Sequence, residues 1–395
     1  MKNVRIVLAG IGGYGAKYVR DLLRGGGEYP YELVGAADPY PDSSPVLADL
    51  RERGIPIYSS LEQFYADCGA DLAILSSPIQ FHCAQTCLAL SHGSHVLCEK
   101  PVSASVEDAR RMIEAREQAQ RFVAIGYQWS FSDSVQAFKR DIASGILGRP
   151  VRFRTLVLWP RSEQYYARSW AGKLRDTEGN LILDSVANNA TAHYIHNMFY
   201  VLGRTADESA QPSRIVAETY RANHIENYDT AAMRAHTEDG TELLYYGSHA
   251  VNEQVGAQFC YEFEHADVTY DDLDPETGIT ARFHNGETKL YGNPNQQSDA
   301  KLWAAVAAAH DAGPIVCGVE AAMSHTVSIH GMQQSMPEIV PFPEEIVRRS
   351  ASLPNGEPGV YVEDLVESMK ACYERGVLPA ESGFSWARPG KEIEL

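Results

Sequence analysis

The sequence predicts an α/β protein in two parts: an N-terminal part built around a parallel sheet, and a C-terminal α+β part with a larger, mostly antiparallel sheet. Two observations predict this division. In the first third of the 395 residues, short apolar runs alternate with helical stretches, which is typical of βαβ units. Near Gly126 the pattern changes to alternating or β-rich segments with few helices between them. We expect one domain over residues 1–126 and a second over residues 127–395.

The elements of the N-terminal part follow from its hydrophobic pattern. Strands are expected where short apolar runs are bounded by polar or turn residues, and Leu72–Leu75 reads as a buried strand because its apolar run is unbroken. The other expected strands are Val4–Ala9, Tyr31–Ala37, His95–Cys98 and residues 122–125. The expected helices are residues 16–23, 61–68, 81–90 and 106–120.

The C-terminal part carries a different set of elements. The expected strands are residues 151–159, 214–221, 230–236 and 242–249. Two helices are expected, at residues 299–310 and at Val319–Ser335, and Ser298 stands where an N-cap for the first is expected. Helical spacing near the C-terminus joins the side chains of Tyr361, Leu365, Met369 and Cys372. These patterns place most strands, and few helices, in the second domain.

The composition excludes several classes of partner. The chain has 34 basic and 52 acidic side chains, a formal net charge of −18, which argues against nucleic acid or an anionic membrane as the main partner. No apolar run is long enough to span a membrane, and no signal peptide is visible. The seven cysteines are scattered without a CxxC pair, so we expect reduced thiols in a cytoplasmic protein.

A glycine-rich turn follows the first expected strand. The segment Gly10-Ile11-Gly12-Gly13-Tyr14-Gly15 matches G-x-G-x-x-G and opens a helix, so its backbone N–H groups can approach a pyrophosphate. Asp38 ends the second strand, where a carboxylate can hold ribose hydroxyls. The alternative is a surface turn with an unrelated helix cap, and the position directly after the first strand favours dinucleotide binding. Because Asp38 would repel a 2′-phosphate and Pro39-Tyr40 supplies no arginine, we expect NAD rather than NADP.

A second motif, Cys98-Glu99-Lys100-Pro101, follows the expected strand His95–Cys98. Ligands of open α/β sheets lie outside the carboxyl ends of the strands, so a lysine here can stand beside the nicotinamide. Burial and the neighbouring Glu99 would adjust the pKa of Lys100 for proton transfer. A surface ion pair is the alternative, and composition alone favours it.

Together with Ser77-Pro78-Ile79-Gln80-Phe81-His82 and Gly126-Tyr127-Gln128, these motifs resemble, in this order, the Gfo/Idh/MocA oxidoreductases, which include glucose–fructose oxidoreductase and inositol dehydrogenases. The resemblance is strong to about residue 150 and traceable through residues 180–203. It implies a Rossmann domain, a C-terminal domain with an open sheet, homodimers or homotetramers through that sheet, and NAD- or NADP-dependent hydride transfer at a hydroxyl-bearing carbon. It implies Lys100 as the catalytic lysine and further cofactor contacts from Ser77, Pro78, His82, Glu99, Lys100 and Gln128. Ile79 replaces an asparagine that is frequent in the family.

The segment of residues 184–203, DSVANNATAHYIHNMFYVLG, holds a third group of candidates. On a helix, Asn189, His193, His196 and Tyr200 share one face, which suits a helix that lines a cleft. In the family an Asp precedes the histidine by four residues and a further acid often follows it by three. His193 falls on that histidine, Asn189 replaces the Asp, His196 replaces the acid, and Asp184 is too distant on a helix to substitute. The alternative is that these histidines are only hydrogen-bonded within the fold.

A zinc site is a rival interpretation of the same segment. Asp184, His193 and His196 are suitable ligand types, but no strong third ligand follows at diagnostic spacing, so we expect no metal. The preceding stretch is rich in aromatic residues, which suit a sugar but more often only pack. The expected substrate contacts are Asn189, His196, Trp170, Lys173, Tyr127 and Asp184.

These patterns predict a cytoplasmic NAD-dependent oxidoreductase that acts on a sugar, glycoside or cyclitol. Lys100, with His193, would exchange the hydroxyl proton while hydride moves between the carbon and the nicotinamide. One alternative uses transient oxidation to cleave a glycosidic bond with the cofactor retained. Another is a nucleotide-sensing regulatory protein on the same scaffold, which the missing carboxylate at Asn189 favours and the intact Lys100 and His193 oppose.

Overall fold

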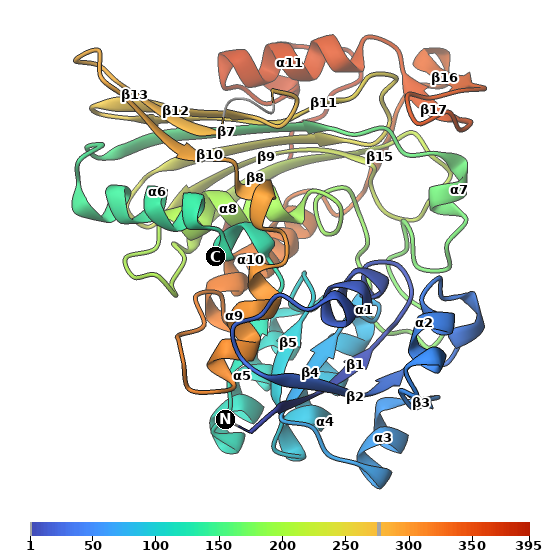
Figure 1. The fold of residues 1–395 in the computed structure, drawn as a ribbon. Coiled ribbons are helices and arrows are strands. Elements are labelled where there is room, and N and C mark those ends of the chain that lie inside the picture. The colour runs from blue at the N-terminus through green and yellow to red at the C-terminus, as the bar shows by residue number, and fades with distance from the viewer. Residues whose placement is uncertain (1, 275–277) are drawn as a thin grey trace. The chain divides into compact units, whose positions relative to one another are not determined.

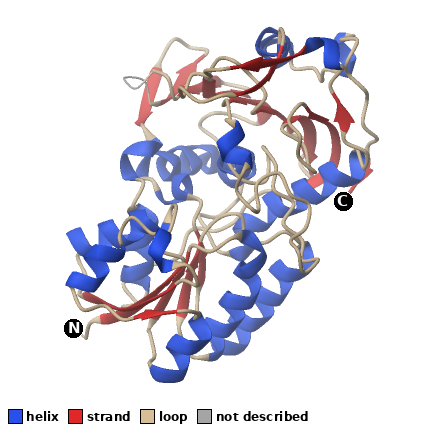
Figure 2. Cartoon of the chain, turned by 90° about the vertical axis from the view of Figure 1, so that its right-hand side faces the viewer, coloured by secondary structure: helices blue, strands red, loops and turns tan. Residues whose placement is uncertain are grey.

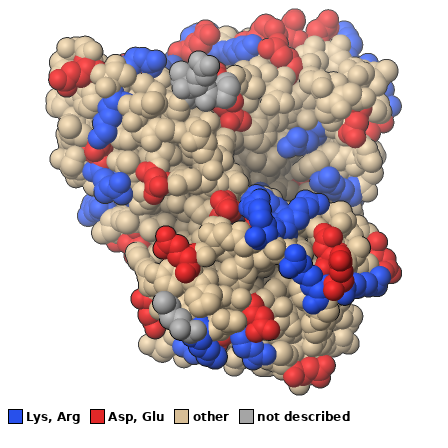
Figure 3. Space-filling view, in the orientation of Figure 1, with Lys and Arg blue, Asp and Glu red and all other residues tan. Residues whose placement is uncertain are grey.

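The computed structural model describes residues 2–274 and 278–395, and the chain divides into two compact units (Figure 1). The first unit comprises Met1–Ser132 and Gln297–Met323, and the second comprises Asp133–Gln296 and Ser324–Leu395. Nothing in the sequence pattern indicated that residues 297–323 pack with the first unit. Within the described residues, no helix combines the length and the apolar character that a membrane crossing requires. Acidic and basic side chains are interspersed over the face drawn in Figure 3.

The first unit is built on a parallel sheet of six strands, as the sequence predicted, with helices on both of its faces (Figure 2). Its strands, in the order in which they pair, are β3 (Ile57–Tyr58), β2 (Tyr31–Ala37), β1 (Val4–Ala9), β4 (Leu72–Leu75), β5 (His95–Cys98) and β6 (Val123–Ile125). Every residue of β4 and β6 is buried because both faces of the sheet are covered. The strand order reverses direction between β1 and β4, and a ligand crevice is expected at such a point.

The helices of the first unit are α1 (Gly15–Arg24), α2 (Leu47–Glu52), α3 (Leu61–Asp67), α4 (His82–Ser91), α5 (Val106–Ala119) and α9 (Ala300–Ala308), with short 3₁₀ turns η1 (Pro41–Ser43), η2 (Ile79–Phe81) and η3 (Gln128–Phe131). Serine side chains cap two of them: Ser60 accepts a hydrogen bond from a backbone N–H in α3, and Ser105 does so in α5. No side-chain hydrogen bond caps the first turn of α1, although the N–H groups of Gly15 and Lys17 already donate to the carbonyls of Gly12 and Tyr14 at 2.9 Å.

Helix α9 returns to this unit from far along the chain. Its Trp303 ring packs 5.5 Å from that of Tyr31, and His310, just beyond the helix, lies 3.0 Å from the carbonyl oxygen of Pro30. The expected N-cap at Ser298 is wrong, because the helix begins at Ala300 and Asp299 holds the cap position. Asp299 also accepts a hydrogen bond from the Trp303 indole at 3.0 Å, which anchors the start of the helix.

The second unit is built on a ten-stranded, mostly antiparallel sheet, which confirms the predicted change of architecture. Its strands, in pairing order, are β14 (Thr288–Gly292), β13 (Ile279–Phe283), β12 (Ala266–Asp271), β11 (Val255–Phe263), β7 (Pro150–Leu158), β10 (Glu242–Ser248), β9 (Thr230–Thr237), β8 (Pro212–Arg221) and β15 (Val340–Pro341), with β18 (Ile393–Glu394) also pairing with β8. Only the β7–β10 and β8–β15 pairs are parallel among the described strands of this sheet.

The remaining elements include α6 (Asp133–Ser144), α7 (Glu163–Tyr166), α8 (Ala192–Val201) and α11 (Leu365–Arg375) in the second unit, and α10 (Val319–Ser335), which runs from the first unit into the second. The strands β16 (Val347–Ser350) and β17 (Gly359–Val362) form a small separate sheet. The short 3₁₀ turns are η4 (Pro294–Gln297), η5 (Glu344–Ile346) and η6 (Ala380–Ser382). Tyr361 therefore lies in β17, and the expected helix over residues 361–372 is correct only from Leu365 onward.

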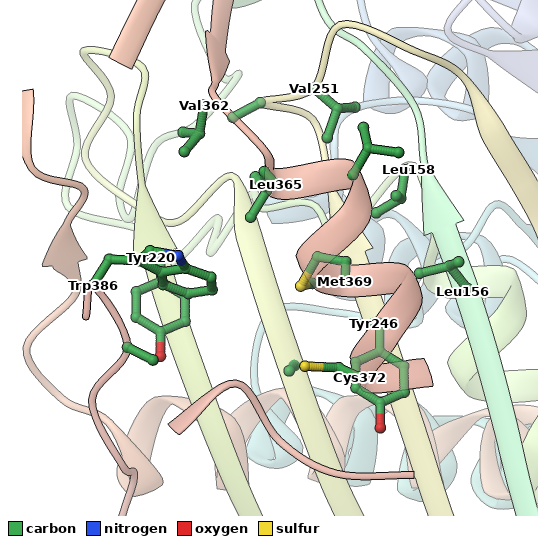
Figure 4. Packing of buried hydrophobic residues seen from close by; sticks show 14 of the residues in the cluster. Leu156, Leu158, Tyr220, Tyr246, Val251, Val362, Leu365, Met369, Cys372 and Trp386 are labelled. Atoms are coloured by element: carbon green, nitrogen blue, oxygen red, sulfur yellow. The ribbon is translucent and has the colours of Figure 1, made fainter. Parts of the chain in front are cut away.

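Helix α11 covers part of one face of the large sheet (Figure 4). Leu365 and Met369 of α11 pack against Leu156 and Tyr246 of the sheet, and all four side chains are almost completely buried. Burying side chains of this kind contributes about 1.5–3 kcal/mol each. Helix α11 thus covers β7 and β10 on this face of the sheet, whereas Arg282 on β13 lies exposed.

Candidate functional site

The glycine-rich turn after β1 is tight on its inner side and open on its outer side. Gly10 has a φ of +83°, and a Cβ there would lie 2.6 Å from the carbonyl oxygen of Ser76. A Cβ on Gly15 would lie 1.9 Å from the carbonyl oxygen of Gly10. No heavy atom lies within 4 Å of the Cβ position of Gly12 or Gly13. The turn therefore needs its outer glycines for close packing, and its middle leaves room for a ligand beside the uncapped start of α1.

Asp38 is fixed at the carboxyl end of β2, next to this turn. One carboxylate oxygen accepts a hydrogen bond from the Ile11 N–H at 2.9 Å, and the other accepts one from the Tyr40 N–H at 2.8 Å. Each oxygen retains a lone pair, so the oriented carboxylate can still accept hydrogen bonds from two neighbouring hydroxyls. The Ser44 hydroxyl donates to the Ile11 carbonyl at 2.7 Å and holds the same loop from its other side.

His82 lies beneath the loops that follow β4 and β5. Its ring nitrogens lie 2.8 Å from the Pro101 carbonyl oxygen and 3.0 Å from that of Ser77, and the side chain is buried. Burial lowers the pKa of His82, although the hydrogen bonds to the carbonyls oppose the shift. The ring thus joins the two loops on which Ser77, Pro78 and Lys100 stand. The Ser77 hydroxyl donates to the Gln85 amide oxygen at 2.6 Å.

Glu99 is the centre of a buried charged network in the first unit. Its Oε1 accepts a hydrogen bond from the Tyr18 hydroxyl at 2.6 Å and forms an ion pair with Lys301 of α9. Burial raises the pKa of Glu99, but the charge and hydrogen bond of Lys301, the Tyr18 hydroxyl and the charge of Lys100 together hold that pKa below its ordinary value. A Cβ on Gly126 would lie 2.8 Å from Oε1, so the network requires glycine there.

This network joins several of the expected cofactor contacts. The Lys100 N–H donates to Glu99 Oε2 at 3.2 Å, and Lys301 Nζ lies 4.4 Å from the centre of the Tyr14 ring. The Tyr14 hydroxyl in turn donates to the Gln128 amide oxygen at 3.2 Å. Sequence reasoning missed Lys301 because 202 residues separate it from Glu99. Its only sequence signal is a lysine within the apolar stretch of α9.

Tyr127 is fully buried in the first unit, and burial raises the pKa of its hydroxyl well above the ordinary range. Burial contributes most to this shift, and charge on Cys317 and Glu99 adds to it. The structure thus places this expected substrate contact in the interior of its unit, next to Gln128, which is half-buried.

In the second unit, the helical interpretation of residues 184–203 is wrong for its first part. Helix α8 begins only at Ala192, and a bend at Ser185 followed by turns over residues 186–191 precedes it. The chain therefore folds back, and the Asn189 side-chain amide donates to Asp184 Oδ1 at 2.8 Å. The Gly172 N–H donates to the other Asp184 oxygen at 2.6 Å, so the buried carboxylate is fixed from two sides. Asp184, which helical spacing put out of reach, lies beside Asn189.

The two histidines of α8 differ in their surroundings. His196 is buried, and its ring stacks on that of Tyr200 at 5.3 Å between centroids. Burial lowers the pKa of His196 well below its ordinary value, and charge on His325 and Lys139 lowers it further. His193, in the first turn of the helix, is half-buried. The structure thus separates a neutral interior histidine from one that solvent reaches.

The aromatic-rich stretch that precedes Asp184 contains further residues that the sequence suggested as substrate contacts. Lys173 donates to Glu226 at 2.8 Å, which ties it into a half-exposed ion pair. Trp170 lies edge-on to Tyr165, with the ring centres 6.0 Å apart. His249, which the sequence analysis did not single out, is buried near Tyr165, and its Nδ1 lies 2.7 Å from the Trp159 carbonyl oxygen. Burial and charge on Arg161 lower the pKa of His249 to about 3, so its ring is neutral.

The described residues contain no group of three or more His, Cys, Asp and Glu side chains arranged to hold a metal ion. The candidate chemistry therefore rests on the glycine-rich turn, Asp38 and Lys100 in the first unit, and on the polar residues around Asp184 and α8 in the second.

Comparison with known proteins identifies the N-terminal part. Residues 4–127 match a family model described as the oxidoreductase family with an NAD-binding Rossmann fold, GFO_IDH_MocA. A 1,5-anhydro-D-fructose reductase of Ensifer adhaerens is 29% identical over 143 residues, which are 35% of this chain and 41% of that protein. Inositol 2-dehydrogenase 1 of Saccharopolyspora erythraea is 31% identical over 151 residues, 38% of this chain and 44% of that protein. The chain thus spans less than half the length of these relatives.

Solved structures extend the similarity in fold to most of the chain. The WlbA dehydrogenase from Bordetella pertussis, in complex with NADH and UDP-GlcNAcA, has a TM-score of 0.68 at 20% identity and covers 84% of this chain and 97% of its own. Myo-inositol 2-dehydrogenase from Lactobacillus plantarum has a TM-score of 0.67 at 16% identity, with coverages of 85% and 98%. At such identities the similarity establishes the shared two-part fold.

Proposed function

We propose, from the premise that residues 4–127 belong to the Gfo/Idh/MocA oxidoreductase family, that this chain transfers hydride between NAD and a hydroxyl-bearing carbon of a sugar, glycoside or cyclitol. The observation that carries the proposal is the placement of Lys100. It follows β5 at the carboxyl end of the parallel sheet, the edge at which the open glycine turn and Asp38 also lie. This position supports a role for the Lys100 amine in proton transfer beside a dinucleotide bound at the glycine turn.

In the first unit, some residues are proposed to bind the cofactor and Lys100 to transfer the proton. The space at Gly12 and Gly13 fits a pyrophosphate, and the oriented Asp38 carboxylate fits a ribose diol. When bound, NAD supplies the hydride acceptor. Lys100 takes up the hydroxyl proton as the carbon is oxidised and returns it in the reverse direction.

For the substrate side we propose His193 as a second proton carrier and the Asp184–Asn189 pair as the hydroxyl-binding group. At neutral pH an amide can orient a hydroxyl but neither takes up nor releases a proton, whereas the adjoining carboxylate supplies negative charge. Trp170 and Lys173 remain predicted substrate contacts. Because His196 and Tyr127 are buried, we propose that they position neighbouring residues and do not contact the substrate directly.

We further propose that NAD is preferred over NADP, that the protein is cytoplasmic, and that it is a homodimer or homotetramer. Asp38 supports the first, since its carboxylate would repel a 2′-phosphate. An assembly through the large sheet would use β12 and β13, where Asp267 and Arg282 are accessible, because α11 covers β7 and β10. Size-exclusion chromatography with light scattering tests the assembly, and a monomer would refute it.

The test of the function is an absorbance screen for NADH, with purified protein and NAD against a panel of sugars, glycosides and cyclitols. NADH formation that Lys100→Met abolishes, with NAD binding retained by calorimetry, supports the proposal. Cleavage of a glycoside without net NADH would instead favour the transient-oxidation alternative. NAD binding without turnover on any member of the panel would favour the regulatory alternative.

A further inference from the structure

A hollow of about 510 Å³ lies in the second unit, around α7. Its lining includes Arg161, Gln164, Tyr165, Arg168, Asn355 and Glu357. It is large enough for a group of a small ligand, and sites for small ligands are concave surfaces with a few convergent polar groups. Its lining carries two arginines and one glutamate.

Both guanidinium groups lie near the ring of Tyr165. The guanidinium carbon of Arg161 lies 5.2 Å from the centre of the Tyr165 ring, and that of Arg168 lies 5.1 Å from it. The guanidinium carbon of Arg161 also lies 6.0 Å from the centre of the Trp159 ring, and that of Arg168 lies 5.7 Å from the centre of the Trp170 ring. Aromatic contacts of this kind orient a guanidinium through its face and leave its N–H edge to form hydrogen bonds.

The charge of these arginines is not balanced by an ion pair. Within the residues that the structure describes, neither guanidinium forms a salt bridge, whereas Arg152, Arg154 and Arg234 of the same unit all pair with glutamates. Arg161 is half-buried and also forms a side-chain hydrogen bond with Tyr165, whereas Arg168 is exposed. A cation without an ion-pair partner favours a bound anion, and partial desolvation, as at Arg161, strengthens this attraction.

The acidic groups nearby leave a net positive charge. Glu357 lines the hollow, and its Oε2 accepts a hydrogen bond from the Asn355 amide at 3.2 Å. Glu163, one residue before Gln164, is directed to Arg349 at 3.3 Å. Two guanidinium groups thus face one carboxylate in the lining. Bidentate arginine contacts to carboxylate or phosphate oxygens are among the strongest hydrogen-bonded pairs in proteins.

Tyr165 and Arg168 of the lining lie near residues that contact or flank the proposed substrate-binding group. Tyr165 lies close enough to Asp184 that the carboxylate raises the pKa of the tyrosine hydroxyl, an effect to which burial contributes more and which the two arginines oppose. Trp170, which contacts Arg168, stands two residues before Gly172, whose N–H binds Asp184.

We propose that this hollow binds the anionic group, carboxylate or phosphate, of an acidic sugar through Arg161 and Arg168. The identification of that ligand with the substrate rests on the proposed function; the binding does not. The probes are D-glucuronate, D-glucose 6-phosphate and neutral D-glucose, titrated into the full chain by calorimetry and by quenching of tryptophan fluorescence. We expect at least one anionic probe to bind about tenfold or more tightly than glucose, with an affinity that falls as NaCl rises.

The matched variants are Arg161→Gln, Arg168→Gln and, as a control, Arg175→Gln. Arg175 belongs to the same segment and is exposed like Arg168, but it donates to the Gly179 carbonyl at 2.7 Å and does not line the hollow. Each of the first two changes is expected to weaken the anionic probe about tenfold or more and to leave glucose unaffected, while the control binds like the parent. Circular dichroism and the urea midpoint establish that each variant is folded.

Equal affinities for the three probes would overturn the proposal, as would Arg161→Gln and Arg168→Gln variants that bind like Arg175→Gln. Arginine-dependent binding without NADH formation supports the site and counts against the proposed function. NADH formation from neutral sugars, at rates that neither arginine variant changes, supports the function and refutes the identification of the bound anion with the substrate.

Discussion

The buried ion pair between Glu99 and Lys301 provides a sharp test of how the first unit is held together. The Lys301 side chain is 1% exposed and that of Glu99 is 9% exposed. In Lys301→Met the apolar volume is kept, but Glu99 loses the cation that compensates its charge. Breaking a buried pair in this way costs about 3–5 kcal/mol, because an uncompensated charge remains. Since Tyr18 still donates to Glu99 and the charge of Lys100 remains nearby, we expect the lower end, about 3 kcal/mol at neutral pH.

The dependence on pH follows from the sign of the pKa shift. In the parent protein the pKa of Glu99 is held low, so the ion pair stabilises the fold above the ordinary glutamate pKa of about 4.3, and this contribution is lost as the pH falls through the lower folded value. Without Lys301, burial dominates and raises the pKa of Glu99, so the variant loses stability as the pH rises through that raised value. The difference between the two proteins should therefore grow from about pH 4 to pH 7.

Urea unfolding of the parent, Lys301→Met, Glu99→Gln and the double variant at both pH values measures this. The double variant should recover most of the loss, because replacing both members of a buried pair is often nearly neutral. The slope with urea should stay unchanged if the variants unfold from the same structure. A difference that is constant with pH, or a double variant as unstable as the sum of the single changes, would refute the ion-pair argument.

Three further predictions concern the proposed chemistry. Lys100→Met should keep NAD binding by calorimetry and lose about 10²–10⁴-fold in kcat, and a near-normal rate would remove Lys100 from proton transfer. Asp38→Ala should narrow the preference for NAD over NADP, and NADP binding as tight as NAD to the parent protein would contradict the role of Asp38. His193→Ala should lower kcat more than Asn189→Ala, whose effect should fall on KM; equal losses of kcat would show that the amide does more than orient a hydroxyl.

The sequence predicted the first unit well because its signals are local. Unbroken apolar runs such as Leu72–Leu75 form strands buried on both faces, and the glycine turn at Gly10 has a backbone conformation that favours glycine. Asp38 also lies where the spacing placed it, beside that turn. In each case the information needed is within one βαβ unit, so a short window of sequence contains the whole argument.

The surroundings of Asn189 were predicted incorrectly because helical periodicity was extended too far. The polar spacing from 189 to 200 is compatible with one helix, but the chain turns through residues 185–191 before α8 begins at Ala192. The Asp184 carboxylate accepts a hydrogen bond from the Asn189 side-chain amide, which favours the turn, and a second one from the Gly172 N–H, which fixes the carboxylate. Local side-chain hydrogen bonds of this kind leave no periodic signal in the sequence.

The fold-back changes what the missing carboxylate at Asn189 means for function. On a continuous helix, Asp184 would be remote from position 189, and the amide would stand alone as a substitute for the aspartate. In the structure, the Asp184 carboxylate lies 2.8 Å from the Asn189 amide, so negative charge is retained at this position on a different residue. The loss of the aspartate therefore ceases to favour a regulatory protein over an enzyme. A substrate hydroxyl bound by Asn189 would also lie near that charge, which raises the pKa of the hydroxyl, so its proton would have to be taken up by a base such as the proposed Lys100 or His193.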